Sequence, residues 1–304
     1  MTHPAADHWP AMPADSWADT RQTLHLWTQI VGKTRLAFSP MVNHWWQVPL
    51  YVTPRGLSTG SMPYASGSCE VVFDFNQHCL RLHTSDGRSR ELALRPRSVA
   101  DFYHYYRTLL RKAGIHVKIW PVPVELEEAT PFAQDEHHCS YDAGAVQQFW
   151  QVLLRADAVL NEFRGGFTGK CSPVHFFWGS FDLAVTRFSG RSAPPHPGGI
   201  PHLADWVTRA SYSAEQSAAG WWPGGNGQAA AFYSYVYPGV PGLAEAAIQP
   251  VEAFFSPKMG EYFLPYEAVH TAPDPRQAVL GFLQSTYAAA ADLSHWDRAA
   301  LERP

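Results

Sequence analysis

Charged residues are scarce in this sequence, and the two signs nearly cancel. Asp, Glu, Lys and Arg make up 16% of the 304 residues, and 23 basic against 27 acidic side chains give a net charge of -4. A chain without excess positive charge has no long-range field to collect a phosphate backbone. We therefore expect no nucleic-acid partner.

Cysteine and long apolar runs are also in short supply. The four cysteines form no C-x-x-C pair and are too few for a secreted disulfide scaffold. The first residues lack the basic start and apolar run of a secretory signal. No apolar stretch reaches the roughly 18 residues of a membrane span, because Asp182 interrupts the longest one, at 174–188. These absences predict a cytoplasmic protein without membrane association.

Aromatic residues, by contrast, are abundant. Phe, Trp and Tyr reach 14% of the chain, with 12 tryptophans, which is more flat apolar surface than a core of this size needs. We expect part of this surface to line a pocket or an interface. The sequence is therefore compatible with a small-molecule ligand and with a homodimer.

The first half of the chain predicts the order helix, sheet, helix. Apolar residues at three- and four-residue spacing predict a helix over 15–31. Alternating apolar and polar residues over 71–94 predict an antiparallel meander. Ser98 is placed to cap a second helix, after which 115–120 is predicted to return as a strand.

The second half repeats this order after a connector rich in proline and acidic residues, 122–141. A long helix is predicted over 142–164. The capping box Ser213–Gln216 predicts a short helix, and Asp274 is placed to cap the last one. Further strands are predicted at 232–237 and 261–266.

Together these patterns predict an α+β fold made of two related halves, 15–121 and 142–304. Each half is expected to be an antiparallel β-sheet with helices packed on one face. A flexible N-terminus, 1–14, precedes them, and the connector 122–141 joins them into one compact unit.

A weak internal repeat supports the two halves. The segment Ser39–Gly56 recurs as Ser172–Gly190, roughly 130 residues later and with small gaps. If a pseudo-two-fold axis relates the halves, His44 and His175 lie close together across a central cleft. The repeat thus predicts both a duplication and a site.

Two histidines that converge among tryptophans are candidates for metal ligands or for a general acid and base. The alternative for each is a buried histidine bonded to backbone, because no H-E-x-x-H spacing fixes two ligands locally. A divalent transition metal would need further ligands. The candidate residues are His44, His175, Asp182 and Glu267 for catalysis, Arg187, Trp46, Trp178, Trp221 and Tyr266 for ligand binding, and His44, His175, His25 and His196 for a metal.

Asp182 and Arg187 lie five residues apart on a presumed strand, so they are expected to face opposite sides of it. A carboxylate in an apolar segment must be paired or hydrogen-bonded, so Asp182 either orients a histidine or locks a loop. Arg187 either holds a substrate carboxylate or phosphate or forms a structural ion pair.

The segment Gly169–Arg191, together with Leu24–Gln29 and Leu283–Tyr287, resembles a bacterial family of unknown function, domain-of-unknown-function family 5996. The likeness extends over nearly the whole chain. It implies one full-length cytoplasmic module and supplies no reaction.

The function expected from the residues is an enzyme that acts on a small aromatic or carboxylated metabolite in a cleft between the halves. The alternative is a non-catalytic module that binds a small molecule in the same aromatic cleft. Converging titratable groups with perturbed pKa values would favour the enzyme, and neutral donors would favour the binding module. A third class, an interaction protein, would expose its tryptophans as a patch.

Overall fold

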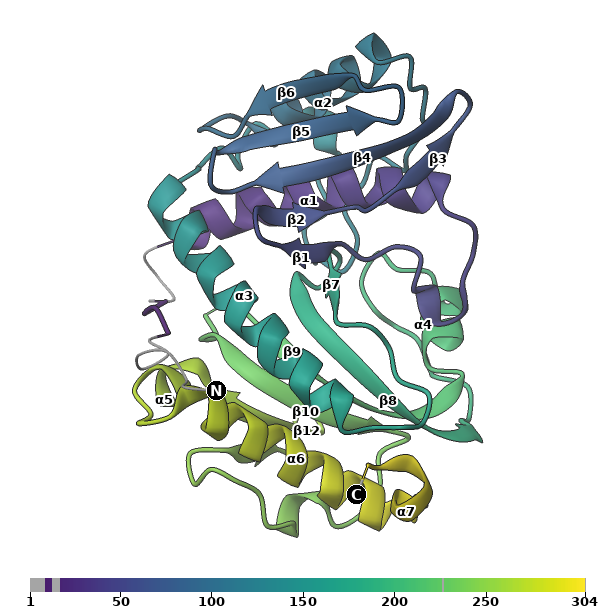
Figure 1. Ribbon diagram of the computed structural model, residues 1–304, viewed down its shortest axis with the longest axis vertical. Helices are drawn as coiled ribbons and strands as arrows, with labels where there is room; N and C mark the ends of the chain where they lie inside the picture. The colour runs from purple at the N-terminus through teal and green to yellow at the C-terminus, as the bar shows by residue number, and fades with distance from the viewer. Residues whose placement is uncertain (1–8, 13–16, 226, 304) are drawn as a thin grey trace.

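The computed structural model describes residues 9–12, 17–225 and 227–303. In this part of the chain the backbone forms two six-stranded antiparallel sheets with associated helices, an α+β fold with one sheet in each half (Figure 1). The predicted fold class is confirmed. None of the helices described combines the length and the apolar character of a membrane span.

The first sheet has the strand order β1-β2-β4-β5-β6, and β3 pairs with β4. Two helices belong to this half, α1 (Ala18–Phe38) and α2 (Val99–Lys112). Residues 15 and 16, where the first helix was predicted to begin, lie outside the described residues, and the helix extends seven residues past the predicted end at 31. The strands are β1 (Tyr51–Thr53), β2 (Gly56–Ser58), β3 (Met62–Tyr64), β4 (Gly67–Asp74), β5 (Cys79–Thr84) and β6 (Ser89–Ala93).

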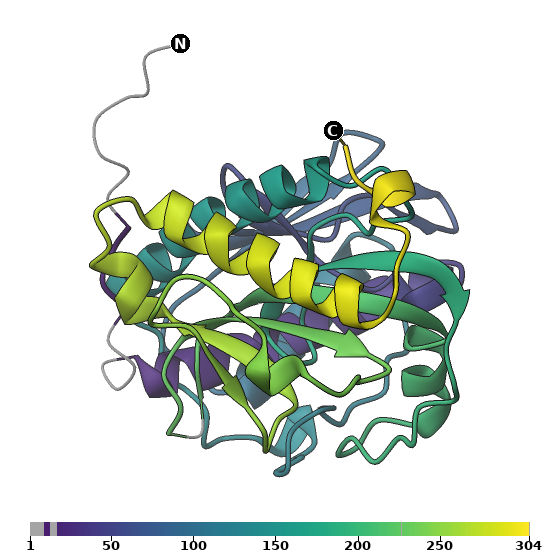
Figure 2. The same ribbon diagram turned by 90° about the horizontal axis from the view of Figure 1, so that it is seen from below.

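The second sheet has the order β11-β12-β10-β9-β8-β7. Its strands are β7 (His175–Phe177), β8 (Asp182–Ser192), β9 (Ala214–Trp222), β10 (Ala231–Tyr237), β11 (Phe254–Ser256) and β12 (Glu261–Pro265). The helices of this half are α3 (Ala143–Gly165), α4 (Asp205–Ser211), α5 (Tyr266–His270), α6 (Pro275–Leu293) and α7 (Arg298–Leu301). The long helices α3 and α6 pack against each other and cover one face of this sheet (Figures 1 and 2).

Three long helices begin where the sequence predicts. The side chains of Ser98, Asp142 and Asp274 each accept a hydrogen bond from the backbone N–H three residues further on. Such N-caps satisfy donors that a helix leaves unpaired in its first turn. Short-range polar chemistry therefore fixes these helix starts.

Two predicted elements are wrong. Residues 115–120 form no strand: their alternating burial places Val117 and Ile119 against the core, but their backbone pairs with no strand among the described residues. The capping box at Ser213–Gln216 starts no helix, because the chain there enters β9 and pairs with both β8 and β10. Pairing along two edges outweighs a local helix signal. The short helix α4 lies just before β9 in the sequence.

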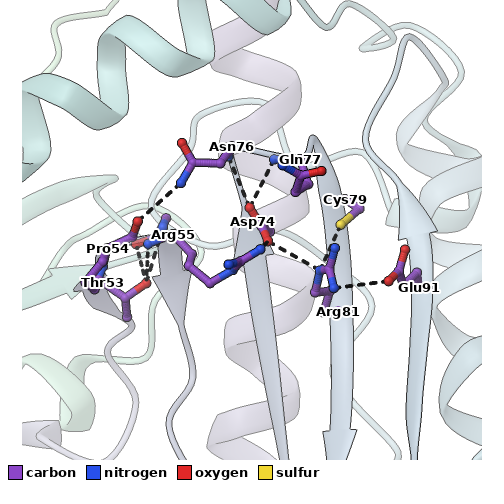
Figure 3. A network of polar contacts seen from close by, with 10 residues as sticks. Thr53, Pro54, Arg55, Asp74, Asn76, Gln77, Cys79, Arg81 and Glu91 are labelled. Atoms are coloured by element: carbon purple, nitrogen blue, oxygen red, sulfur yellow. Dashed lines mark hydrogen bonds and ion pairs between the residues drawn. The ribbon is translucent and has the colours of Figure 1, made fainter.

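A buried carboxylate ties the strands of the first sheet together (Figure 3). Asp74 is fully buried and accepts hydrogen bonds from the side chain of Arg55. The same oxygen forms an ion pair with Arg81, whose Nε lies 3.3 Å away. Its other oxygen accepts the backbone N–H groups of Asn76 and Gln77, both at 3.1 Å. All of its lone-pair directions are used within the sheet, so this carboxylate has a structural role.

The two halves share one hydrophobic core. Leu50, just before β1, and Phe176, in β7, exchange both backbone hydrogen bonds at 2.9 Å. Trp9, within the N-terminal stretch, is buried and its ring contacts Phe232 and Tyr266. Residues far apart in the sequence therefore meet in one interior.

Candidate functional site

A cavity of about 270 Å³ lies where the second sheet, the segment around the end of α1, the connector and α4 come together. Its floor is the face of the second sheet opposite α3 and α6. Because side chains alternate along a strand, Asp182, Ala184, Thr186 and Phe188 of β8 all face the cavity. The walls are mostly aromatic and aliphatic, with a few polar groups among them.

Asp182 lies on the cavity floor with only 7% of its surface exposed. It accepts hydrogen bonds from the hydroxyls of Tyr233, in β10, and Ser180, in the turn between β7 and β8. Burial raises the pKa of the Asp182 carboxyl, and the two hydroxyl donors oppose that rise. These contacts connect a turn to a neighbouring strand, and none of them is to a histidine.

Glu125 enters the cavity from the connector on a backbone with φ of 61°, a region uncommon for any residue but glycine. The buried side chain of Gln29 holds the preceding residue, because it donates to Val124 O and accepts from Val124 N, both at 2.9 Å. The Glu125 N–H donates to Pro201 O at 3.0 Å. The carboxyl group itself accepts no hydrogen bond from the described residues.

The environment of Glu125 favours its neutral form. Burial raises the pKa of this carboxyl to about 7, the charge of Asp182 adds to the rise, and Lys33 opposes it. Gly179 makes room for the group: a Cβ at that position would lie 1.9 Å from Glu125 Oε1. The carbonyl of Gly179 is in turn held at 2.9 Å from His25 Nε2.

Lys33 projects from α1 into the same cavity with 4% of its surface exposed. Its Nζ lies 5.6 Å from the centroid of the Trp178 ring, and it has neither a hydrogen bond nor an ion-pair partner in the described part of the chain. Burial lowers the pKa of the Lys33 ammonium to about 8, against the opposing charge of Glu125. The Trp178 indole is fixed by donating to Val48 O at 2.9 Å.

His44 lines the cavity, but both of its ring nitrogens are engaged. Nδ1 lies 3.0 Å from Ser211 O, and Nε2 lies 2.7 Å from Lys170 Nζ. Because a carbonyl can only accept and an ammonium can only donate, we assign the proton to Nδ1. Burial lowers the pKa of the ring, so the neutral form is favoured.

His175 is buried under aromatic side chains, with 1% of its surface exposed. Neither ring nitrogen has a hydrogen-bond partner in the residues described, and burial lowers the pKa of the ring to about 3. The rings of His44 and His175 both contact the indole of Trp46, at centroid distances of 5.4 and 5.9 Å. Of the two, only His44 lines the cavity.

Arg187 lies on the opposite face of β8 from Asp182, the side that alternation predicts. It is buried beneath α3 and α6, with its guanidinium 3.5 Å from the Phe163 ring centroid and 4.3 Å from that of Tyr287. Its Nη2 donates to Phe163 O. Burial lowers the pKa of this guanidinium to about 10. Arg187 therefore has a structural environment remote from the cavity.

The remaining candidates lie around the cavity or away from it. Trp46 and Trp178 are part of its wall. The others contact different parts of the molecule: His25 stacks on Phe181, His196 contacts Tyr212 and Tyr237, Trp221 is buried against Phe149, the Tyr266 hydroxyl donates to Pro10 O, and Glu267 is exposed.

Metal ligation by the four predicted histidines finds no geometric support. In residues 9–12, 17–225 and 227–303, no group of three or more His, Cys, Asp or Glu side chains is placed to hold a metal ion. The histidines instead contact backbone groups, an ammonium and aromatic rings. Their predicted convergence at a metal is therefore not seen.

Sequence reasoning missed Lys33, Glu125, Tyr233 and Tyr235, all of which line the cavity. One signal was available for Lys33, since it lies three residues after Ile30 and so continues the apolar stripe of its helix. Glu125 lies between two apolar residues, Val124 and Leu126. Neither signal specifies which part of the second half Lys33 or Glu125 contacts.

The chain belongs to a protein family. The family model described as "Family of unknown function (DUF5996)" matches residues 9–303, which is nearly the whole chain. The resemblance noted in the sequence is thereby confirmed. No curated protein and no solved structure matches the chain.

Proposed function

We propose that this member of the DUF5996 family is an enzyme that binds a small aromatic or carboxylated metabolite in the cavity and transfers protons on it. The observation that supports this most directly is a pair of carboxyl groups, Glu125 and Asp182, in one apolar cavity with different partners. Pairs of titratable groups whose environments differ are typical of acid–base catalysis.

The two carboxyl groups suit different roles. Glu125 has no hydrogen-bond donor among the described residues and a pKa raised to about 7, so it can give or take a proton near neutral pH. Asp182 is held by Tyr233 and Ser180, so it is the positioning group that orients the Tyr233 hydroxyl. We assign the acid–base role to Glu125 in preference to His44, whose nitrogens are both engaged.

The walls suit a flat substrate with a polar end. Trp46, Trp178 and Tyr235 offer aromatic faces, on which planar groups stack favourably. Lys33 offers a positive charge that contacts no counterion among the described residues and would attract a carboxylate or a carbonyl oxygen. Converging titratable groups support an enzyme over the non-catalytic binding module.

Proton transfer is tested by exchange in D2O. The wild-type protein would be incubated with a panel of small aldehydes, oxo acids and aromatic acids, and carbon-bound protons followed by NMR. We expect exchange or conversion of at least one compound, reduced at least about tenfold in Glu125→Gln and unchanged in Glu127→Gln, whose side chain is exposed on the same connector. Equal rates in Glu125→Gln would contradict the proposal, and binding without any conversion would favour the binding module.

We also propose a cytoplasmic location. The four cysteines are all free thiols, as expected in a reducing compartment. We also propose an internal duplication, on the order of the elements. In each half, one long helix precedes a six-stranded antiparallel sheet and another follows it.

A further inference from the structure

In the proposed function Lys33 supplies a positive charge, and its amine takes no part in the acid–base chemistry at Glu125. Its side chain is 96% buried, yet its Nζ contacts a tryptophan face where an ion-pair partner would be expected. A buried ammonium is costly unless it is paired, and such a lysine readily loses its proton. Burial lowers the pKa of this ammonium to about 8, so near neutral pH a larger fraction of Lys33 is the uncharged, nucleophilic amine than of an ordinary lysine.

We infer that Lys33 forms a Schiff base with an aldehyde or ketone group of the substrate. The inference rests on the proposed function, because it uses the same cavity and assigns Glu125 a partner. Three features of the geometry support it: the buried Nζ that faces the cavity, the carboxyl group of Glu125 nearby without a hydrogen bond, and the Trp178 face beside Nζ.

The chemistry balances with the groups present. The neutral amine of Lys33 adds to the carbonyl carbon, and one amine proton moves to the carbonyl oxygen to give a carbinolamine. The nitrogen lone pair then expels the hydroxyl group, which takes the proton of the Glu125 carboxylic acid and leaves as water. The product is an iminium cation at Lys33 with the Glu125 carboxylate as its counterion, and no oxidant or reductant is required.

The surroundings stabilise each stage of this sequence. The iminium cation would occupy the place of the ammonium, 5.6 Å from the Trp178 ring, where the aromatic face attracts a cation. Trp178 cannot easily move away, since its ring packs against the backbone of Gly32, where an added Cβ would lie 2.3 Å from the indole. The apolar walls also limit hydrolysis by bulk water.

Reductive trapping tests the inference. The protein would be incubated at about pH 7 with benzaldehyde or pyruvate and sodium cyanoborohydride, and the lysines mapped by peptide mass spectrometry. Since the pKa of Lys33 is lowered to about 8, its neutral fraction is on the order of a hundredfold that of an ordinary lysine. We expect labelling of Lys33 more than about tenfold above that of the exposed Lys112, Lys118 and Lys258.

Matched variants separate the contributions. Lys33→Arg keeps the positive charge and should abolish the labelled peptide, whereas Lys118→Arg should leave labelling at Lys33 unchanged. Glu125→Gln should slow labelling, because the acid that expels water is missing. Its melting temperature would be measured alongside, so that loss of folding is recognised as such.

Binding of the two probes is followed separately by saturation-transfer NMR. Transfer to a probe without labelling at Lys33 overturns the Schiff base and leaves the proposed function standing. Labelling at Lys33 no greater than at the exposed lysines, with both probes, also overturns it. Failure of the proposed function is recognised by a different result, in which no compound exchanges protons in D2O in a way that depends on Glu125.

Discussion

Asp74 is fully buried and Glu125 is partly buried, and their surroundings give the two carboxyl groups opposite properties. Asp74 contacts two guanidinium groups and two backbone N–H groups, so its charge is compensated inside the first sheet. Burial raises the pKa of the Glu125 carboxyl to about 7, and no donor among the described residues opposes that rise by a hydrogen bond. Satisfied carboxylates stabilise a fold, whereas an unsatisfied one in a cavity is available for chemistry.

Glu125 should make the stability of the protein depend on pH. Its pKa is raised in the folded state from the ordinary 4.5 to about 7. Between these values the folded state keeps a proton that the unfolded state has lost, so the free energy of unfolding falls as the pH rises through this window. Relative to Glu125→Gln, the wild type should lose on the order of 2 kcal/mol between about pH 5 and about pH 8.

Urea unfolding at several pH values measures this difference. Glu127→Gln, at an exposed position of the same connector, should follow the wild type throughout. Parallel curves for the wild type and Glu125→Gln would show that the carboxyl of Glu125 is ionised in the folded protein as it is in the unfolded one.

Asp74 should contribute stability and nothing to the cavity. Asp74→Ala leaves two backbone N–H groups and two guanidinium groups without their acceptor, and we expect a loss of about 2–4 kcal/mol in the free energy of unfolding. Glu91→Ala removes an exposed partner of the same Arg81 and should cost less than about 1 kcal/mol. Equal costs in denaturant titrations of the two variants would contradict the role given to Asp74.

The site residues could be predicted from the sequence only in part. Four of the predicted residues line the cavity, namely His44, Trp46, Trp178 and Asp182. A lone carboxylate or an indole in an apolar segment is conspicuous in a sequence. Lys33 and Glu125 were missed because they come together only in the folded protein. The connector is held against α1 by the hydrogen bonds between Gln29 and Val124, and no local sequence pattern encodes this contact. Residue type identifies candidates, and tertiary contacts decide among them.

At the scale of elements, predictions succeeded where short-range chemistry decides the outcome. The caps at Ser98, Asp142 and Asp274 each satisfy a backbone donor three residues further along the chain, so a local signal marks these helix starts. The capping box at Ser213 failed because β9 has a strand on each side, and a ladder on both edges outweighs one local cap. The segment 115–120 has a strand-like alternation, but none of the described strands pairs with it.

The turn between β7 and β8 should control the site through Gly179. A methyl group there would meet the end of the Glu125 side chain at 1.9 Å, and that flexible side chain can rotate to another position. Gly179→Ala should therefore cost less than about 1 kcal/mol in stability while it displaces the carboxyl group and slows the reductive labelling of Lys33.

Gly165→Ala is the matched control for this turn, because an added Cβ at Gly165 meets nothing within 4 Å. Both variants would be compared by thermal unfolding and by labelling with benzaldehyde. Normal labelling in Gly179→Ala would show that the position of the Glu125 carboxyl is unimportant for the reaction at Lys33.

At the scale of the whole molecule, the cavity exists only because the two halves are joined. Lys33 comes from the first half, Glu125 from the connector and Asp182 from the second half. The Trp178 indole of the second half donates to Val48 O of the first. A site assembled in this way requires that the halves keep a fixed relation.

The two halves should therefore unfold together. One continuous core and the paired hydrogen bonds between Leu50 and Phe176 connect the sheets, so neither half can open without exposing apolar surface of the other. Urea unfolding followed by tryptophan fluorescence and by far-UV circular dichroism should give one coincident transition. Asp74→Ala, which weakens only the first sheet, should lower the midpoint seen by both probes equally. If that variant instead separates the two curves, the halves are independent folding units and the cavity is an interface between domains.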